Sequence, residues 1–159
     1  MDEVIALRDV EEGDLSVFIQ QHRDREACYM AALDFTQGIA DDEQFLARWN
    51  SHVQITGAVV KTIVVGGQIA GYIYRYGDDD EKYLSLWLGK NFWGRQVGTR
   101  AVKLFIEQCC LIKALNAVTA KDNLASRRVL EKCGFGMVLE YKTYSYLRDG
   151  QVEACYYRY

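Results

Sequence analysis

The residues best suited to chemistry gather in one short segment, where two glycines and two arginines precede a long apolar run. Gly94 and Gly98 predict a loop, and the breaker-free stretch from Val97 onward predicts the helix that follows it. The first turn of a helix offers free backbone N–H groups and the positive end of the helix dipole, so it binds phosphates. Arg95 and Arg100 add positive charge beside it. The segment therefore predicts a pyrophosphate cradle, while its spacing alone fits a plain turn with solvating arginines equally well.

Other features of this segment bear on the kind of ligand. The Thr99 hydroxyl adds a hydrogen-bond donor, and Gly98 allows a ligand to approach the backbone closely. The segment lacks the Gly-Lys-Ser/Thr ending of a P-loop and the three glycines of a dinucleotide fingerprint. A mononucleotide-binding domain of the flavodoxin type is an alternative. That architecture would end in a helix, whereas Asp149-Gly150 predicts a late two-residue β-hairpin.

The elements around the cradle form a pattern typical of one α/β domain over residues 1–159, without linker or repeat. Asp14 and Asn123 are expected as helix N-caps, Gly134 as a left-handed helix end, and Gly66-Gly67 as a hairpin turn. Helices are expected from Asp14, from Asp41 or Asp42, over 97–112 and from Asn123 to Gly134. Strands are expected over 4–10, 56–65, 68–76, 83–88, 117–120, 137–147 and 152–159. Residues 21–40 show no clear pattern.

The composition excludes several classes of protein. The 159 residues carry a formal net charge of −3, so no basic excess suggests nucleic-acid binding. No apolar run is long enough to span a bilayer, and no secretory signal opens the chain. The five cysteines are odd in number and lack CxxC spacing, which favours reduced thiols in the cytoplasm. Two histidines outside any cluster argue against a zinc site.

Two motifs resemble the GNAT superfamily of acyltransferases. Residues 95–100, Arg-Gln-Val-Gly-Thr-Arg, resemble its pyrophosphate loop, Arg/Gln-x-x-Gly-x-Gly/Ala. Residues 123–135 are similar to the Asn-x-x-Ser-x-x-Val-x-Glu-Lys-x-Gly-Phe motif of its RimJ/RimL-type branch, and the segments 86–89 and 92–94 fit the same branch. These matches fall in the right order over most of the chain, which makes the set far more specific than either motif alone.

The resemblance implies both a fold and an activity. The fold is α/β (α+β), with a central, mixed, mostly antiparallel twisted sheet of about seven strands flanked by helices. The activity is transfer of an acetyl group from acetyl-CoA to a primary amine, by direct attack in a ternary complex. The acceptor would be a protein N-terminus or a small amine. A non-catalytic regulator that binds acyl-CoA is the competing interpretation, because Leu130 stands where many members carry a tyrosine acid.

The resemblance also assigns residues to the cofactor, although Gln96 replaces a glycine common in the branch and Arg100 replaces a small residue. Neither change removes a backbone donor. Asn123 would serve as both N-cap and cofactor contact. The expected cofactor-binding residues are Trp87, Leu88, Arg95, Gln96, Val97, Gly98, Thr99, Arg100, Asn123, Ser126 and Arg128.

Four residues are candidates for the chemical step. The backbone N–H of Leu88 could stabilise the oxyanion, since the strand before the loop pairs with the pantetheine arm in this family. Ser126 could hydrogen-bond the leaving thiolate. Glu81 and Ser85 could accept or relay the proton of the amine. Glu81 also fits a solvated acidic loop over 78–81, and Ser85 fits an ordinary strand residue.

Acceptor choice is expected in residues 21–52 and in the loop 77–82, which match no motif. Asp34, Asp41 and Asp42 could attract an amine, although a helix cap accounts for Asp41 or Asp42 equally well. The aromatic tail is strand-forming and could also make a homodimer surface. Its tyrosines are Tyr141, Tyr144, Tyr146, Tyr156, Tyr157 and Tyr159.

Overall fold

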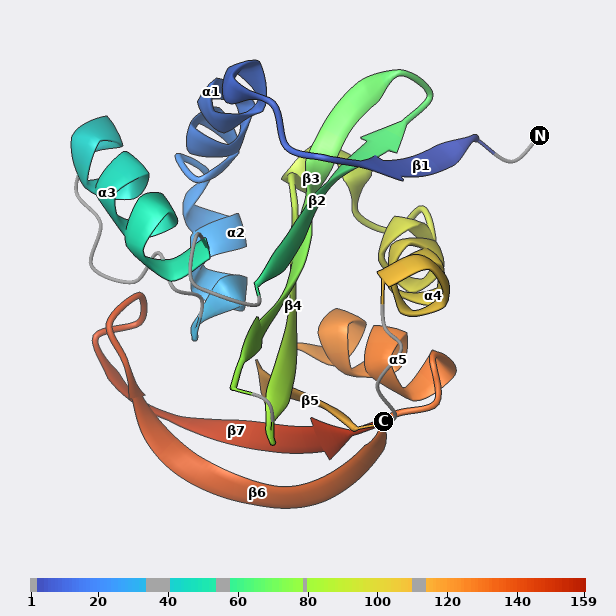
Figure 1. Cartoon of the computed structure of the whole chain (residues 1–159). Coiled ribbons are helices and arrows are strands. Elements are labelled where there is room, and N and C mark those ends of the chain that lie inside the picture. Colours follow the sequence, from blue (N-terminus) through green and yellow to red (C-terminus); the bar gives the residue numbers. More distant parts are fainter. Residues whose placement is uncertain (1–2, 34–40, 54–57, 79, 110–113) are drawn as a thin grey trace.

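Seven strands form one sheet in the computed structural model, which describes residues 3–33, 41–53, 58–78, 80–109 and 114–159 (Figure 1). The strands are β1 (Ile5–Arg8), β2 (Val59–Val65), β3 (Gln68–Gly77), β4 (Lys82–Leu88), β5 (Leu115–Ala120), β6 (Gly136–Ser145) and β7 (Gly150–Arg158). Their spatial order is β1-β2-β3-β4-β5-β7-β6. Only β4 and β5 pair in parallel. The expected mixed, mostly antiparallel sheet is confirmed.

Helices cover both faces of the sheet. Figure 1 shows the first three helices on one side of the central strands and the last two on the other. They are α1 (Glu12–Gln21), α2 (Arg25–Ala31), α3 (Asp42–Val53), α4 (Val97–Cys109) and α5 (Leu124–Lys132), with a short 3₁₀ turn η1 (Lys90–Phe92) before α4. No helix within the described ranges is long and apolar enough to cross a membrane.

The two faces of the sheet bury different cores. The α4–α5 face is mainly aliphatic, with Ile63, Ile73 and Leu115 completely buried. The α1–α3 face is mainly aromatic, and its Phe18, Trp49 and Tyr72 pack ring against ring at centroid distances of 4.9–5.4 Å. Because side chains alternate along a strand, β3 and β4 supply residues to both cores.

Helix α5 begins and ends as its sequence predicts. The Asn123 side chain accepts a hydrogen bond from the Ser126 N–H at 3.1 Å, which caps the first turn. At the other end, Gly134 has a φ of 93°. The N–H of Phe135 donates to the Leu130 carbonyl and the N–H of Gly134 donates to the Glu131 carbonyl. This is a Schellman motif, which fixes where the chain leaves the helix.

Asp14 occupies a different place from the one expected. It is the third residue of α1, not the N-cap, which is Glu11. Its buried carboxylate accepts hydrogen bonds from Arg8 at 2.7 and 2.9 Å, from Thr62 at 2.7 Å and from the Glu11 N–H at 2.9 Å. Burial favours the neutral acid, but these donors outweigh it and lower the pKa of Asp14 to about 2. The carboxylate therefore ties α1 to β1 and β2.

The late hairpin is longer than predicted. Ser145 pairs with Gly150, so four residues, 146–149, connect β6 to β7. The predicted two-residue turn is wrong because contacts outside the hairpin hold this connection. Arg148 forms a bidentate ion pair with Asp122 at 2.7 and 2.9 Å and donates to the Tyr29 carbonyl at 2.8 Å.

The end of α2 is a junction between these distant segments. Besides the Tyr29 contact of Arg148, the Met30 carbonyl accepts from the Asn123 side chain at 3.1 Å. The Ala32 carbonyl accepts from the buried Ser145 hydroxyl at 2.6 Å. The C-terminal end of α2 is thus hydrogen-bonded to both the start of α5 and the end of β6.

Candidate active site

A gap opens in the sheet between β4 and β5. The two strands pair only at Lys82 with Leu115 and at Tyr83 with Asn116, and beyond these residues no pairing continues between the two strands, both fully described. A cavity of about 100 Å³ occupies the gap. Its described lining comes from β4, β5, α5 and the end of α2, together with Val102 of α4: Ala31, Leu33, Leu84, Ser85, Leu86, Val102, Ala117, Val118, Thr119, Asn123, Ser126, Val129 and Leu130. We call it the small cavity.

Backbone N–H groups of β4 point toward this gap. The N–H of Gly89 donates to the Ala70 carbonyl on the β3 side at 2.9 Å. Because successive N–H groups of a strand point to opposite sides, those of Leu88 and Leu86 face β5. Leu86 lines the small cavity, whereas Leu88 is not among its described lining residues. The oxyanion donor expected at Leu88 therefore has an alternative in Leu86, which sequence reasoning missed.

The loop between β4 and α4 has the backbone geometry of a cradle. Gly94 and Gln96 both have positive φ, at 71° and 62°. The first helical hydrogen bond of α4 runs from the Arg100 N–H to the Gln96 carbonyl. The N–H groups of Val97, Gly98 and Thr99 consequently have no acceptor within the helix. Three donors at the positive end of a helix fit a pyrophosphate group.

Gly98 has a packing role in addition to the ligand approach predicted from the sequence. It lies buried in the first turn of α4. A Cβ at this position would approach Val129 to 3.1 Å and Leu86 to 3.4 Å. The glycine therefore allows α4 to pack closely on α5 and β4. The Thr99 side chain is also buried, so Thr99 offers the loop its backbone N–H.

The two arginines of the loop differ in their contacts. Arg95 is exposed, forms an ion pair with Glu3 and donates to the Asn91 carbonyl at 3.2 Å. Arg100 is half-buried in the first turn of α4. A hydrogen bond from Arg95, together with the charges of Arg95 and Arg100, lowers the pKa of Glu3. Because both arginines stabilise the negative charge of the Glu3 carboxylate, the surroundings of this loop favour anions.

The start of α5 brings further predicted residues to the small cavity. Ser126 and Asn123 line it, and so does Leu130. The Asn123 side chain is already engaged as the cap and as a donor to the Met30 carbonyl. Arg128 is exposed on α5 and is not among the described lining residues of either cavity.

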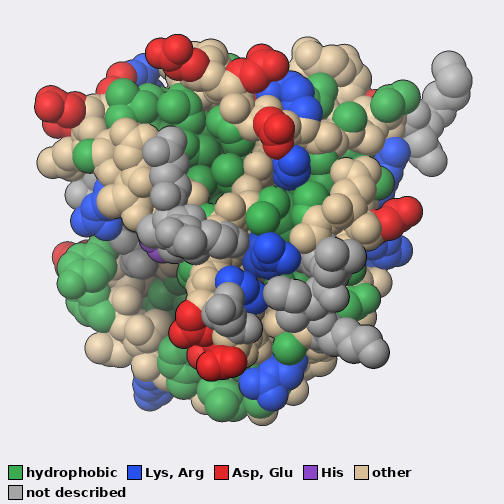
Figure 2. All heavy atoms as spheres, viewed as in Figure 1, with side chains coloured by type: hydrophobic (Ala, Val, Ile, Leu, Met, Phe, Trp, Pro, Cys, Tyr) green, Lys and Arg blue, Asp and Glu red, His purple; other side chains and the backbone are tan. Residues whose placement is uncertain are grey.

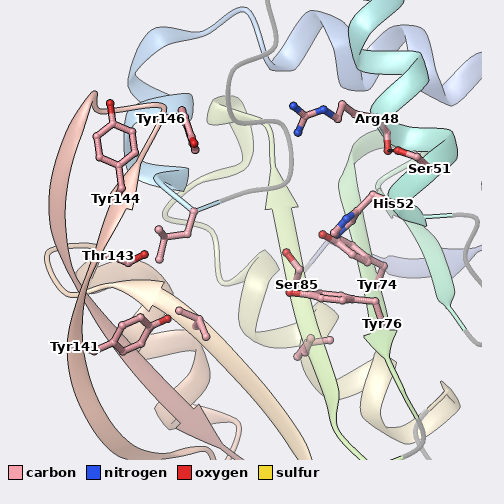
Figure 3. A pocket seen from close by; sticks show the side chains of 13 residues that line it. Arg48, Ser51, His52, Tyr74, Tyr76, Ser85, Tyr141, Thr143, Tyr144 and Tyr146 are labelled. Carbon is pink, nitrogen blue, oxygen red and sulfur yellow. Dashed lines mark hydrogen bonds between the residues drawn. The ribbon is translucent and has the colours of Figure 1, made fainter.

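A larger cavity of about 850 Å³ lies between α3 and β6. Figure 3 shows Arg48 extending from α3 toward the β6 side, with His52 of the same helix beside Tyr74 of β3. The space-filling view shows a hollow in this region with a histidine visible inside it (Figure 2). The described lining residues are Leu33, Arg48, Ser51, His52, Tyr74, Tyr76, Leu84, Ser85, Val118, Tyr141, Thr143, Tyr144 and Tyr146. We call it the large cavity.

The two cavities meet at the gap. Leu33, Leu84, Ser85 and Val118 line both of them. Ser85 is half-buried, and Figure 3 shows its hydroxyl on the wall of the large cavity. Of the predicted site residues, the structure therefore brings Ser85, Asn123 and Ser126 together around one opening.

Two predicted residues lie elsewhere. Trp87 is buried among the aromatic side chains of the α1–α3 face, where it stacks on His22 and donates to the Gln21 side chain at 3.1 Å. Glu81 is exposed at the start of β4 and accepts from the Tyr156 hydroxyl at 3.4 Å. Burial and the Glu81 carboxylate raise the pKa of Tyr83. Neither Trp87 nor Glu81 is among the described lining residues of the cavities.

Two of the carboxylates expected to attract an acceptor, Asp41 and Asp42, are not among the described lining residues of the large cavity. Asp41 caps α3 by accepting from the Gln44 N–H at 2.8 Å, and Asp42 forms an exposed ion pair with Arg23. Asp34 lies outside the described residues. Sequence reasoning missed Arg48, His52 and the β3 tyrosines, although the alternation of Tyr72, Tyr74 and Tyr76 on one strand face was a readable signal.

The comparisons identify the family. The model of the acetyltransferase (GNAT) domain matches residues 5–136, most of the chain. The chain belongs to the GNAT acetyltransferase family. It transfers an acetyl group from acetyl-CoA, and the gap and the cradle described above fit that co-substrate. No curated protein matches the chain significantly.

Solved structures show the same fold at low sequence identity. The spermidine N-acetyltransferase of Vibrio cholerae, in complex with CoA and spermine, has a TM-score of 0.82 and 12% identity over 98% of this GNAT chain and 94% of its own. The ribosomal L7/L12 alpha-N-protein acetyltransferase RimL, in complex with CoA, has a TM-score of 0.81 and 18% identity over 98% and 93%. A phosphinothricin acetyltransferase from Sinorhizobium meliloti, in complex with acetyl-CoA, has a TM-score of 0.78 and 14% identity over 100% and 88%.

Metal ligands and cysteine thiols are the remaining groups that could take part in chemistry. Among the described residues, no group of three or more His, Cys, Asp and Glu could hold a metal ion. Cys28, Cys109, Cys133 and Cys155 are free thiols. Burial raises the pKa of both Cys133 and Cys155, which makes them poor nucleophiles. Cys110 lies outside the described residues.

Proposed function

We propose that this acetyltransferase acetylates a primary amine, which enters through the large cavity and meets acetyl-CoA at the gap between β4 and β5. The observation that carries the proposal is the shared wall of the two cavities. Ser85 and Val118 line both, so an acceptor in the large cavity can reach a thioester in the small one. Direct attack in a ternary complex needs such an opening, because no covalent enzyme intermediate links the two substrates.

In the proposed binding mode, the pyrophosphate of acetyl-CoA lies against the N–H groups of Val97, Gly98 and Thr99. The pantetheine arm runs along the unpaired edge of β4, and the N–H of Leu86 or Leu88 donates to the thioester carbonyl. Donors fixed in a strand stabilise the developing oxyanion without reorganisation. Ser126 also lines the small cavity, and we assign it as the hydrogen-bond donor to the leaving sulfur.

In the chemical step, the amine nitrogen bonds to the carbonyl carbon, the carbon–sulfur bond breaks, and the thiolate of CoA leaves. The nitrogen gives up a proton and the thiolate takes one. An amine with a pKa of about 10.4 is mostly protonated at neutral pH, and its deprotonation costs roughly 4–5 kcal/mol. We assign the proton relay to Ser85 and the tyrosine hydroxyls of the large cavity, because Glu81 lies outside its described lining.

Several finer assignments extend the proposal beyond the site. We assign the chain to the RimJ/RimL-type branch on residues 86–94 and 123–135, and we propose that it acts in the reducing cytoplasm as one domain over 1–159. The exposed apolar residues Met137, Val138 and Leu139 on edge strand β6 support a homodimer.

A regulator that binds acetyl-CoA without turnover is the second candidate. Leu130 favours it, because this residue cannot protonate the leaving thiolate.

The decisive experiment is calorimetric titration of the purified chain with acetyl-CoA, followed by thiol release with a panel of amines. The variant Arg95→Ala/Arg100→Ala should weaken binding about 10-fold or more, since charged hydrogen bonds contribute about 1.5–3 kcal/mol each. The matched control, Lys103→Ala/Lys142→Ala, removes the same charge from exposed residues that are not among the described lining of either cavity. It should bind normally.

Three outcomes separate the candidates. Saturable binding with thiol release on amine addition supports the acetyltransferase. Saturable binding without thiol release from any amine supports the regulator. Absence of binding at millimolar acetyl-CoA would contradict both candidates.

A further inference from the structure

The charged side chains that line the large cavity indicate which amines it accepts. Its described lining contains one arginine and one histidine but no aspartate or glutamate. The Asp149 carboxylate, in the turn after β6, accepts a hydrogen bond at 2.6 Å from the hydroxyl of the lining residue Tyr144. An acceptor with several positive charges would need carboxylates in the lining, because ammonium groups lose their hydration on entry.

Arg48 supplies the positive charge of this surface. It extends from α3 into the space in front of Tyr144 and Tyr146 (Figure 3). A guanidinium binds carboxylates and phosphonates through two parallel hydrogen bonds. This argument concerns the sign of the charge that the lining presents to a ligand, whatever else Arg48 contacts in the protein.

Aromatic side chains form most of the remaining wall. His52 lies against Tyr76 and edge-on to Tyr74, at ring-centroid distances of 5.2 and 5.8 Å. The tyrosines on the β6 side add hydroxyl groups across the cavity. Together they offer ring faces for the body of a ligand and hydroxyl donors for an oxyanion.

We propose that the acceptor is a primary amine that also carries an acidic oxyanion group, which Arg48 binds, and that polyamines are poor acceptors. This inference rests on the proposed acetyltransferase function. Arg48 is therefore a specificity residue, and Ser85 marks the point where the amine reaches the thioester.

The test measures thiol release from acetyl-CoA with matched pairs of acceptors that differ only in the acid group. The pairs are phenylalanine with phenethylamine, lysine with 1,5-diaminopentane, and 3-aminopropylphosphonate with propylamine; spermine is added as the polyamine. Rates are compared per neutral amine at two pH values, which removes differences in amine pKa. The first two pairs report on carboxylates and the third on phosphonates.

We expect the acid-bearing member of at least one pair to have a kcat/KM about 10-fold or more above its partner, as a charged hydrogen-bonded pair gives. Arg48→Gln should abolish this preference by raising KM, with kcat nearly unchanged. Arg48→Lys should retain part of it. Arg25→Gln, the same change at an exposed position of α2 that is not among the described lining residues, should behave as wild type.

Failure of this inference differs from failure of the proposed function. If amines release thiol but the acid group gives no advantage, or if Arg48→Gln keeps the advantage, only the assignment of Arg48 is overturned. Spermine as the best acceptor would overturn it as well. If no amine releases thiol, the acetyltransferase proposal fails and this inference fails with it. Melting temperatures of all variants show whether they remain folded.

Discussion

The two faces of the sheet build their binding surfaces in different ways. On the α4–α5 face, the proposed cofactor surface consists of backbone N–H groups of Val97–Thr99 and of β4, held by tightly packed aliphatic residues. On the α1–α3 face, side chains from α3, β3, β4 and β6 converge on a cavity of about 850 Å³. A backbone surface tolerates many side chains, whereas a side-chain surface changes its ligand with each substitution. One fold can therefore keep its acetyl donor while its acceptor varies.

The largest expected effect comes from removing the Asp14 carboxylate, which ties α1 to β1 and β2. Asp14→Ala leaves the half-buried Arg8 and the buried Thr62 without their acceptor and should lower the free energy of unfolding by about 2–4 kcal/mol. Urea denaturation measures this change. The matched control is Asp9→Ala, whose exposed carboxylate pairs with Lys61 and should cost at most about 1 kcal/mol.

The same carboxylate gives a pH signature. Its pKa is about 2 in the folded chain against a reference value of 3.8. A depressed pKa stabilises the fold above the unfolded value, so this contribution, roughly 2.5 kcal/mol, is lost as pH falls from about 4 to 2. Asp14→Ala should lose this part of the acid sensitivity. Equal effects of the Asp14 and Asp9 variants would show that the buried network does not support this face.

A smaller effect tests whether packing holds the cofactor surface. Gly98→Val places methyl groups against Val129 and Leu86 and should lower the free energy of unfolding by about 1–3 kcal/mol, as overpacking does. Adding Val129→Ala should recover part of this loss, because it removes the methyl group nearest to the new Cβ. Thermal denaturation of the single and double variants measures the coupling. Purely additive effects would argue against close packing of α4 on α5.

The smallest effect concerns the conformation of the cradle. Gln96 has a φ of 62°, which costs a residue with a Cβ about 1–2 kcal/mol and glycine almost nothing. Gln96→Gly should therefore raise the free energy of unfolding by about 0.5–1 kcal/mol after the added flexibility of the unfolded chain is counted. Affinity for acetyl-CoA should stay unchanged, because the backbone donors remain. Gln44→Gly, at a helical position of α3, should destabilise instead.

The sequence predicts those features of the structure that depend on residues close together in the chain. The cap at Asn123, the Schellman end at Gly134 and the loop before α4 are local, and their residue types determine them. The interpretation of Gly98 needed the tertiary contact with Val129, which no spacing reveals. The same holds for Asp14, whose buried partners Arg8 and Thr62 come from two strands.

The acceptor surface was harder to predict because its residues meet only after folding. Arg48 lies on α3 and Tyr74 and Tyr76 lie on β3, and no spacing in the sequence links the two elements. Helix α2 lies within residues 21–40, which show no clear sequence pattern, although Asp24 caps it by accepting from the Ala27 N–H at 2.9 Å. A clearer reading of that cap would have predicted the helix, but not the cavity beside it.

The junction at the end of α2 has a consequence for how ligands leave. Carbonyls of Tyr29, Met30 and Ala32 hold the start of α5, which borders the small cavity, and the end of β6, which borders the large one. The Met30 carbonyl holds the first wall and the Tyr29 and Ala32 carbonyls hold the second, so outward movement of either wall disturbs the end of α2. We therefore expect the two walls to open together, so that a ligand in either cavity slows the local opening of both walls. CoA and the acetylated product should then leave during the same local opening. Hydrogen exchange measures this opening: the amide protons of α2 and α5 should both exchange more slowly when either substrate binds.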